Sequence, residues 1–254
     1  MDIHQLLEPP VEEAEVLDVI PELSLARGLG QGPYHHLDVF EHTMEVVRGV
    51  ERELQEDLLG AHIPSERVGG LRLVGLLHDV AKPVSRGEYD GKVLFVAHDT
   101  LGARLAHRVC RRLGVSAEDT DLVVTLTALH LKIGFMRNER SDYPPPRLAR
   151  AAGPFGEELA VLSWADRAAA QGPRLKQEHL DRHYDLCAEF LRISRERGPY
   201  SLPDYVNLTR GAQEDTETDA GYAASWARLL ESRKPLRGGT TEYVAQKRGV
   251  NRPV

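Results

Sequence analysis

The chain has 254 residues, of which 41% are hydrophobic and 28% charged, with a net charge of −7. This length and composition suffice for one sizeable domain with appendages, and the negative charge argues against a protein that simply coats nucleic acid. Two cysteines outside any CxxC pair argue against a disulfide scaffold and a zinc ribbon. The N-terminus lacks a secretory pattern, and no apolar run reaches membrane-spanning length. We therefore expect a cytoplasmic protein that does not bind membranes.

Three regions differ in character along the chain. Residues 1–33 are acidic and contain Pro, and glycines break the chain before residue 34, so we expect a lead-in. Residues 34–198 carry amphipathic helical patterns without a repeat or a convincing run of strands, which predicts one all-α domain, a helical bundle. Residues 199–254 are polar, with one candidate helix at 222–230, and are expected to form a less regular C-terminal extension.

Six helices are predicted in the central region from apolar residues at helical spacing. Their expected spans are about 37–54, 65–82, 99–113, 117–130, 157–170 and 177–197. The second helix should stop at Lys82, because Pro83 disfavours helical geometry in the residue before it. Between the helices, residues 85–96 should form a loop or a small hairpin, and residues 137–147 a charged, Pro-rich loop.

Four polar residues lie within these predicted apolar helices: His42, His78, Asp79 and Asp166. Polar groups in such places cost free energy unless they are paired or bind a metal, and one divalent cation would satisfy all four. Two imidazoles and two carboxylates suit Mn²⁺, Fe²⁺, Co²⁺, Ni²⁺, Zn²⁺ or, less ideally, Mg²⁺. Each residue alone also has a structural explanation, since a lone buried histidine is usually a satisfied core residue.

The order of these residues, His, then His-Asp, then a late Asp, resembles the HD-domain metal-dependent phosphohydrolase superfamily. The chain is particularly similar to the HD domain of bacterial CCA-adding tRNA nucleotidyltransferases, over roughly residues 20–195. The shared stretches are Tyr34-His35-His36-Leu37-Asp38-Val39-Phe40-Glu41-His42-Thr43, Leu76-Leu77-His78-Asp79-Val80-Ala81-Lys82-Pro83, Phe95-Val96-Ala97-His98-Asp99 and Ala165-Asp166-Arg167. By position, the resemblance implies that the metal ligands are His42, His78, Asp79 and Asp166. Residues before 34 leave no room for the nucleotidyltransferase domain of such enzymes, so we do not expect CCA addition by this chain.

His98 and His130 match the order of the extra histidines that hold a second metal in dinuclear members of the superfamily. They could instead bind the scissile phosphate, or only pack. Lys82 fits the family pattern His-Asp-x-x-Lys, and four residues after His78 it should lie on the same side of the helix, within reach of a phosphate. It could equally be a lysine that offsets the helix dipole. The expected cofactor is thus one or two divalent metal ions.

Two further groups could contact a substrate. His35 and His36 precede the first predicted helix, although histidines there are more often turn residues. Arg104 and Arg108 belong to a basic stripe on the third predicted helix that could grip a nucleotide or an RNA backbone, although a solvated helix face is the more common explanation.

The resemblance implies a phosphomonoesterase or 2′,3′-cyclic phosphodiesterase that acts on a nucleotide or RNA-end phosphate ester through a metal-activated water. Asp79 would orient or deprotonate the water, and Lys82 would offset phosphoryl charge. The chain lacks a P-loop and the motifs of a covalent nucleophile. It also lacks the residues typical of (p)ppGpp hydrolases, HD-GYP phosphodiesterases and deoxynucleoside-triphosphate hydrolases. The alternative is a non-catalytic, metal-stabilised module that binds tRNA or a nucleotidyltransferase partner.

Overall fold

Particular residues mark where several of the bundle helices begin or end. In the computed structural model, which describes residues 3–89, 91–139, 141–198 and 200, Asp38 and Glu41 form a capping box at the start of helix α3 (Val39–Glu56). The Ser116 hydroxyl accepts a hydrogen bond from the Asp119 amide, 3.1 Å away, and so caps α7 (Ala117–Leu129). Gly114, with a φ of +67°, allows the chain to turn away after α6 (His98–Arg112).

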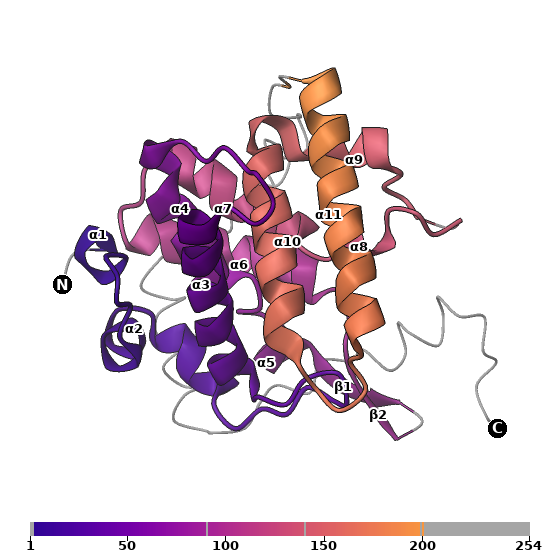
Figure 1. Cartoon of the computed structure of the whole chain (residues 1–254). Coiled ribbons are helices and arrows are strands. Elements are labelled where there is room, and N and C mark those ends of the chain that lie inside the picture. The colour runs from indigo at the N-terminus through magenta and orange to yellow at the C-terminus, as the bar shows by residue number, and fades with distance from the viewer. Residues whose placement is uncertain (1–2, 90, 140, 199, 201–254) are drawn as a thin grey trace.

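Within the described residues, six longer helices make up the bundle, and Figure 1 shows how they lie. Helix α3 packs against α4 (Val68–Leu77) and α10 (Gly156–Ala170), while α7 packs against α4 and α6, and α11 (Gln177–Arg197) covers α10. The strands in the described part are β1 (Arg86–Tyr89) and β2 (Lys92–Phe95), which pair antiparallel as one hairpin. The predicted all-α class is confirmed, and so is the small hairpin.

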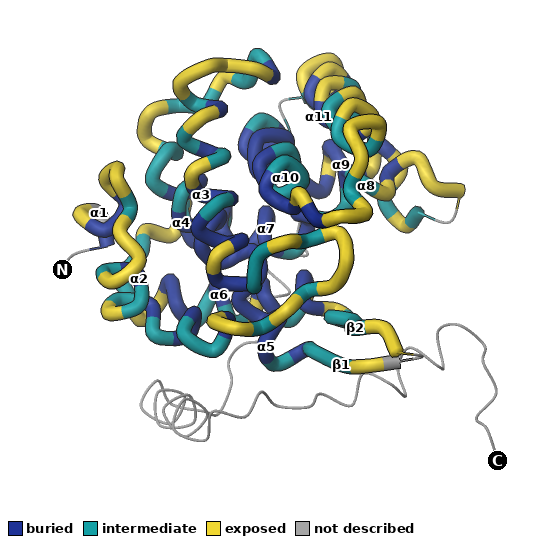
Figure 2. The backbone as a smooth tube through the Cα atoms, turned by 60° about the horizontal axis from the view of Figure 1, so that its bottom comes forward, coloured by how far each residue is buried: buried dark blue, intermediate teal, exposed yellow. Residues whose placement is uncertain are grey.

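The core lies where α3, α4, α7 and α10 meet, and Figure 2 shows the buried residues concentrated on these helices. Two glycines bring α3 close to its neighbours. A Cβ atom on Gly49 would lie 3.1 Å from the Ala165 Cβ of α10, and one on Gly75 of α4 would lie 3.2 Å from a Val47 methyl. These close approaches fix the position of α3 relative to both helices.

The second predicted helix ends earlier than expected. Regular α4 stops at Leu77, and residues 78–81 form turns with hydrogen bonds from Val80 to Leu77 and from Lys82 to Asp79. Pro83 does not terminate this helix. It lies in the first turn of a short helix, α5 (Lys82–Ser85), where a missing N–H costs nothing.

The lead-in contributes to the core. It forms α1 (Ile3–Leu6), α2 (Glu13–Val19) and the 3-10 helix η1 (Pro21–Ala26), and Leu6, Ile20 and Leu23 are buried. The Glu22 carboxylate accepts two hydrogen bonds, of 2.8 and 2.7 Å, from Arg112 of α6. The described part of the lead-in, residues 3–33, therefore packs on the bundle, while a domain boundary at residue 34 stays a prediction.

Short helices occupy the connections. They are η2 (Ser65–Arg67), α8 (Lys132–Phe135), α9 (Pro145–Ala152) and η3 (Gly153–Phe155). The predicted Pro-rich loop at 137–147 is thus shorter than expected, because Pro145 and Pro146 start α9. The candidate helix at 222–230 lies outside the described residues, as does nearly all of the predicted extension at 199–254. Among the described residues, no helix has the length and apolar character needed to cross a bilayer.

Candidate metal centre

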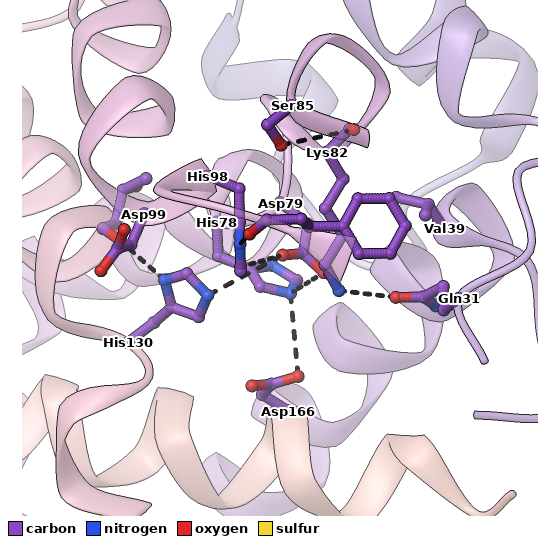
Figure 3. A network of polar contacts seen from close by, with 12 residues as sticks. Gln31, Val39, His78, Asp79, Lys82, Ser85, His98, Asp99, His130 and Asp166 are labelled. Atoms are coloured by element: carbon purple, nitrogen blue, oxygen red, sulfur yellow. Dashed lines mark hydrogen bonds and ion pairs between the residues drawn. The ribbon is translucent and has the colours of Figure 1, made fainter. Parts of the chain in front are cut away.

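Residues that are far apart in the sequence come together at one place in the bundle. Figure 3 shows most of them, namely His78, Asp79, His98, His130 and Asp166. His42 lies in the second turn of α3, His78 and Asp79 directly follow α4, and Asp166 lies on α10. His98 starts α6, and His130 directly follows α7. All six residues predicted as first- or second-metal ligands therefore meet, although they are up to 124 positions apart in the sequence.

The first group contains the four ligands implied by the resemblance. His42 Nε2 lies 2.9 Å from Asp166 Oδ1 and 3.8 Å from Asp79 Oδ2. His78 Nε2 lies 3.1 Å from Asp79 Oδ2 and 3.9 Å from Asp166 Oδ1. His42, His78 and Asp79 are almost completely buried.

The second group uses the other oxygen of the same aspartate. Asp79 Oδ1 lies 3.5 Å from His98 Nε2 and 3.8 Å from His130 Nε2. Two sets of three residues, His42–His78–Asp79 and Asp79–His98–His130, thus have ligand atoms close enough to hold a metal ion. Asp79 belongs to both sets, with one oxygen facing each.

The backbone fixes the orientation of three of these histidines. The Nδ1 atoms of His78, His98 and His130 lie 2.8, 2.6 and 2.7 Å from the carbonyl oxygens of Gly75, Phe95 and Thr127, each three residues earlier. A carbonyl oxygen only accepts, so Nδ1 carries the proton and the Nε2 lone pair faces the centre. Backbone carbonyls hold metal-binding histidines in this way.

Several acceptor atoms at the centre are buried without hydrogen-bond partners: His78 Nε2, His98 Nε2, His130 Nε2 and Asp79 Oδ1. Asp79 Oδ2 is paired with the Lys82 ammonium. Each unpaired atom is an acceptor in its neutral-imidazole or carboxylate form, and acceptors facing one another at these distances require a cation or a proton between them. The residues therefore fit a divalent cation. In keeping with this, the pKa of His78 is raised: burial lowers it, but the Asp79 carboxylate outweighs burial, so without a metal His78 can hold a proton there.

The other pKa shifts keep the donors ready to bind a cation. Burial raises the pKa of Asp79, but His78 and Lys82 outweigh burial and hold it well below its usual value. Burial likewise opposes ionisation of Asp166, yet the hydrogen bond from His42 keeps its pKa far below the ordinary value. Burial lowers the pKa of His98, and burial together with His98 lowers that of His130 to about 4. Both histidines are thus neutral at pH 7.

Lys82 is the only lysine of the described residues that contacts this centre. Its Nζ lies 2.6 Å from Asp79 Oδ2 and donates a hydrogen bond of 2.6 Å to Gln31 Oε1. Because α4 has already ended, Lys82 reaches the centre through its closeness to Asp79 rather than by sharing a helix face with His78. Gln31 lies in the glycine-rich segment before α3 and was not predicted as a site residue. No pattern in the residues around it indicates a contact with Lys82.

A cavity of about 350 Å³ opens beside the centre, and its wall includes Asp79, Lys82, His98, His130 and Asp166. Of the four predicted substrate contacts, His35 lines the cavity, with its ring edge-on to His42. His36 does not, and its Nδ1 lies 3.0 Å from the Ala170 carbonyl oxygen. Arg104 and Arg108 lie on α6 and are not among the lining residues.

Two further lining residues, Arg167 and His183, were not predicted as site residues. Arg167 directly follows Asp166. His183 lies on the inward face of α11 with Cys187, Phe190 and Leu191, which are also buried. A histidine at the spacing of an apolar stripe is a sequence signal that could have drawn attention to His183.

The comparison with family models decides the family. The model of the HD domain matches residues 39–171, more than half of the chain. The chain belongs to the HD domain family. HD domains fit a superfamily of metal-dependent phosphohydrolases, in agreement with the His/Asp cluster.

Several curated proteins are similar to this HD protein. The A-adding tRNA nucleotidyltransferase of Deinococcus radiodurans is 32% identical over 81% of this chain and 46% of its own length. The CC-adding tRNA nucleotidyltransferase of Thermus thermophilus is 29% identical over 88% of this chain and 47% of its own. The bifunctional uridylyltransferase/uridylyl-removing enzyme of Novosphingobium aromaticivorans is 38% identical over 43% of this chain and 12% of its own. The chain thus spans about half the length of the tRNA nucleotidyltransferases that it matches.

Proposed function

We propose that this HD protein is a divalent-metal-dependent phosphohydrolase, a phosphomonoesterase or 2′,3′-cyclic phosphodiesterase acting on a nucleotide or RNA-end phosphate ester. One observation carries the proposal. The buried Asp79 carboxylate turns its two oxygens toward two pairs of histidines, and Asp79 Oδ1 and the Nε2 atoms of His78, His98 and His130 have no hydrogen-bond partners. A cavity beside them has room for a small phosphate ester.

We assign the first metal to His42, His78, Asp79 and Asp166, and a second to Asp79, His98 and His130. The alternative role of His98 and His130, direct contact with a phosphate, fits less well. A neutral imidazole whose Nδ1–H is bound to a backbone carbonyl presents only a lone pair at Nε2. Phosphate oxygens are acceptors too, so these Nε2 atoms suit a cation better than an anion.

A bound divalent cation would polarise the phosphoryl oxygens and lower the pKa of a water molecule towards neutrality. The chain supplies the rest of the chemistry. Asp79, whose pKa is held well below its usual value, orients the attacking water, and the proton of this water passes to solvent in the cavity. Lys82 Nζ, aimed at the centre by Gln31, donates to a phosphoryl oxygen as negative charge builds on it. The Asp166 carboxylate fixes the His42 ring through the 2.9 Å contact.

Hydrolysis by metal-reconstituted protein tests the proposal. Protein stripped with chelator would be supplied in turn with Mn²⁺, Ni²⁺, Co²⁺, Zn²⁺ and Mg²⁺, and assayed on 2′,3′-cyclic AMP, nucleoside monophosphates and a chromogenic phosphodiester. Asp79→Asn should reduce both metal content and turnover by more than about a hundredfold. Asp181→Asn, on the exposed face of α11, is the matched control and should change neither.

Tight metal binding without turnover of any of these substrates would overturn the phosphohydrolase proposal. It would favour instead a metal-stabilised module that binds tRNA or a nucleotidyltransferase chain. A binding module would fit the similarity to tRNA nucleotidyltransferases, because this chain matches only about half of the length of those proteins.

A further inference from the structure

His183 occupies an unusual position for a core histidine. Its ring lies where α8, α10 and α11 meet, and only 8% of the residue is exposed. Nε2 lies 3.0 Å from both the carbonyl oxygen and the hydroxyl oxygen of Ser163 on α10. His183 also lines the cavity beside the metal centre.

Ser163 determines which nitrogen of His183 carries the proton. The Ser163 carbonyl oxygen only accepts, so Nε2 is the donor and Nδ1 keeps its lone pair. Burial, and then the charge of Arg167, lower the pKa of His183 to about 4, so the ring is neutral at pH 7. Nδ1 has no hydrogen-bond partner among the described residues. It is therefore an unused acceptor on a buried side chain.

Gly134 of α8 leaves this acceptor uncovered. A Cβ atom at position 134 would lie 3.4 Å from Cε1 and 3.7 Å from Nδ1 of His183. Gly134 and His183 line the same cavity, so the missing side chain keeps the Nδ1 edge of the ring open to it.

Arg167 supplies a positive charge in the same wall. It lines the cavity, and it makes no hydrogen bond or ion pair with any described residue. Its Nε is buried without a partner. A buried donor without a partner costs free energy that a bound anion could offset. Because Arg167 directly follows Asp166, this cation lies next to the metal centre.

We propose that His183 and Arg167 form a subsite for a ribose phosphate, in which Nδ1 accepts a hydrogen bond from the sugar hydroxyl beside the phosphate and Arg167 donates to the phosphate. A hydrogen-bond acceptor beside a cation favours a ligand that carries a neutral donor beside an anion. A ribose 3′-phosphate with a free 2′-hydroxyl has this arrangement, because its hydroxyl and phosphate groups lie on neighbouring carbons. The inference rests on the proposed function and narrows it. The site takes ribonucleotide ends in preference to deoxyribonucleotide ends.

Equilibrium binding of two ligands tests this subsite. Adenosine 3′-monophosphate and its 2′-deoxy analogue would be titrated calorimetrically into the full chain in chelator, where no hydrolysis occurs. The wild-type protein should bind the ribose form about tenfold more tightly, as expected for one hydrogen bond in a desolvated site. His183→Phe should abolish this preference. His183→Asn should restore part of it, because the Asn side-chain oxygen can take the place of Nδ1.

Gly134→Ala is a second variant that leaves His183 itself intact. Alanine is a better helix former than glycine, so the protein should fold at least as well, while the new methyl group covers Nδ1 and reduces the preference for ribose. Equal wild-type affinity for the two ligands, or no binding of either, would overturn the inference. So would a preference that survives in both His183→Phe and Gly134→Ala.

Turnover of the same ligands with Mn²⁺ separates this inference from the proposed function. Hydrolysis of both ligands at equal rates and equal affinities would overturn the subsite and leave the phosphohydrolase standing. A ribose preference in binding without any turnover would support the subsite and count against the phosphohydrolase.

Discussion

At the scale of single residues, the contact between Lys82 and Asp79 joins the candidate metal centre to the cavity beside it. Lys82 Nζ lies 2.6 Å from the Asp79 oxygen that faces His42 and His78. A fixed cation so close to a ligand oxygen opposes the binding of another cation there. The lysine is therefore better suited to stabilising negative charge on a substrate than to holding the metal.

Replacing Lys82 with Met separates these two roles. Metal affinity should stay the same or rise, because a competing charge is removed. The turnover number should fall by roughly 10²- to 10³-fold, because a donor to the phosphoryl oxygens is lost. Equilibrium dialysis with Mn²⁺ and initial rates would measure the two effects. Lys92→Met, on an exposed position of β2, is the control. Loss of metal from the Lys82 variant would contradict this assignment.

The residue types of the centre could be predicted from the sequence, but their surroundings could not. His42, the His78-Asp79 pair and Asp166 stand out because each interrupts an apolar pattern. Gln31 and His183 reach the cavity only through the packing of the lead-in and of α11, which local patterns do not encode. Arg104 and Arg108 form a conspicuous stripe in the sequence, yet α6 turns that stripe away from the cavity lining.

At the scale of elements, the close contacts of α3 with α4 and α10 fix the relative positions of the candidate metal ligands on these helices. Gly49 approaches Ala165, the residue next to Asp166, and His42 is two helical turns earlier on the same helix. Any side chain at position 49 would push α3 and α10 apart. The 2.9 Å contact between His42 and Asp166 depends on this separation.

Gly49→Leu should therefore weaken both the fold and the metal site. We expect a loss of about 1–3 kcal/mol in the free energy of unfolding from overpacking, and a lower affinity for metal. Gly69→Leu on α4 is the matched control, because nothing lies within 4 Å of a Cβ atom there. It should leave stability unchanged or raise it slightly through helix propensity. Urea denaturation of both variants in chelator would decide, and equal stability of the two variants would refute the packing argument.

Two long helices were predicted well, and short elements were not. The predicted spans 157–170 and 177–197 closely match α10 and α11. The spans of α1, α2 and α9 were missed, because a four- to eight-residue helix shows too few turns for a hydrophobic period to be recognised. The end of α4 was predicted too late. The turns at residues 78–81 contain His78 and Asp79, and residue propensities do not predict them.

At the scale of the whole molecule, the buried histidines make stability depend on pH. The pKa of His183 is about 4 in the folded protein, against 6.5 for an ordinary histidine. A lowered pKa means that the unfolded chain binds more protons than the folded one between these values. Stability from this group is therefore complete above pH 6.5 and falls as the pH drops towards 4.

Between pH 7 and pH 5, His183 should account for a loss of about 2 kcal/mol in the free energy of unfolding. Urea denaturation of the metal-free protein at both pH values measures the total loss. His183→Asn removes the titrating group, so this variant should lose less stability over the same interval. An identical loss in the variant and the wild type would show that the histidine does not contribute.

The ion pair between Glu22 and Arg112 should stabilise the whole fold as well as the lead-in. Glu22 is 2% exposed and accepts two hydrogen bonds from Arg112. Arg112→Ala would leave this carboxylate buried without its cation, and we expect a loss of about 3 kcal/mol. Arg104→Ala, an exposed position of the same helix, should cost little. A melting temperature unchanged by Arg112→Ala would mean that the lead-in detaches without consequence for the bundle.

The cavity wall is assembled from both sides of the segment that defines the family. All six candidate metal ligands lie within residues 39–171, whereas Gln31 and His35 precede that segment and His183 follows it. Changes in the flanking sequences can therefore remodel part of the cavity wall while the candidate metal ligands stay as they are. Related proteins that keep the same four-residue signature can therefore differ in the shape and charge of this cavity, and an isolated 39–171 fragment would carry the candidate metal ligands without Gln31, His35 and His183.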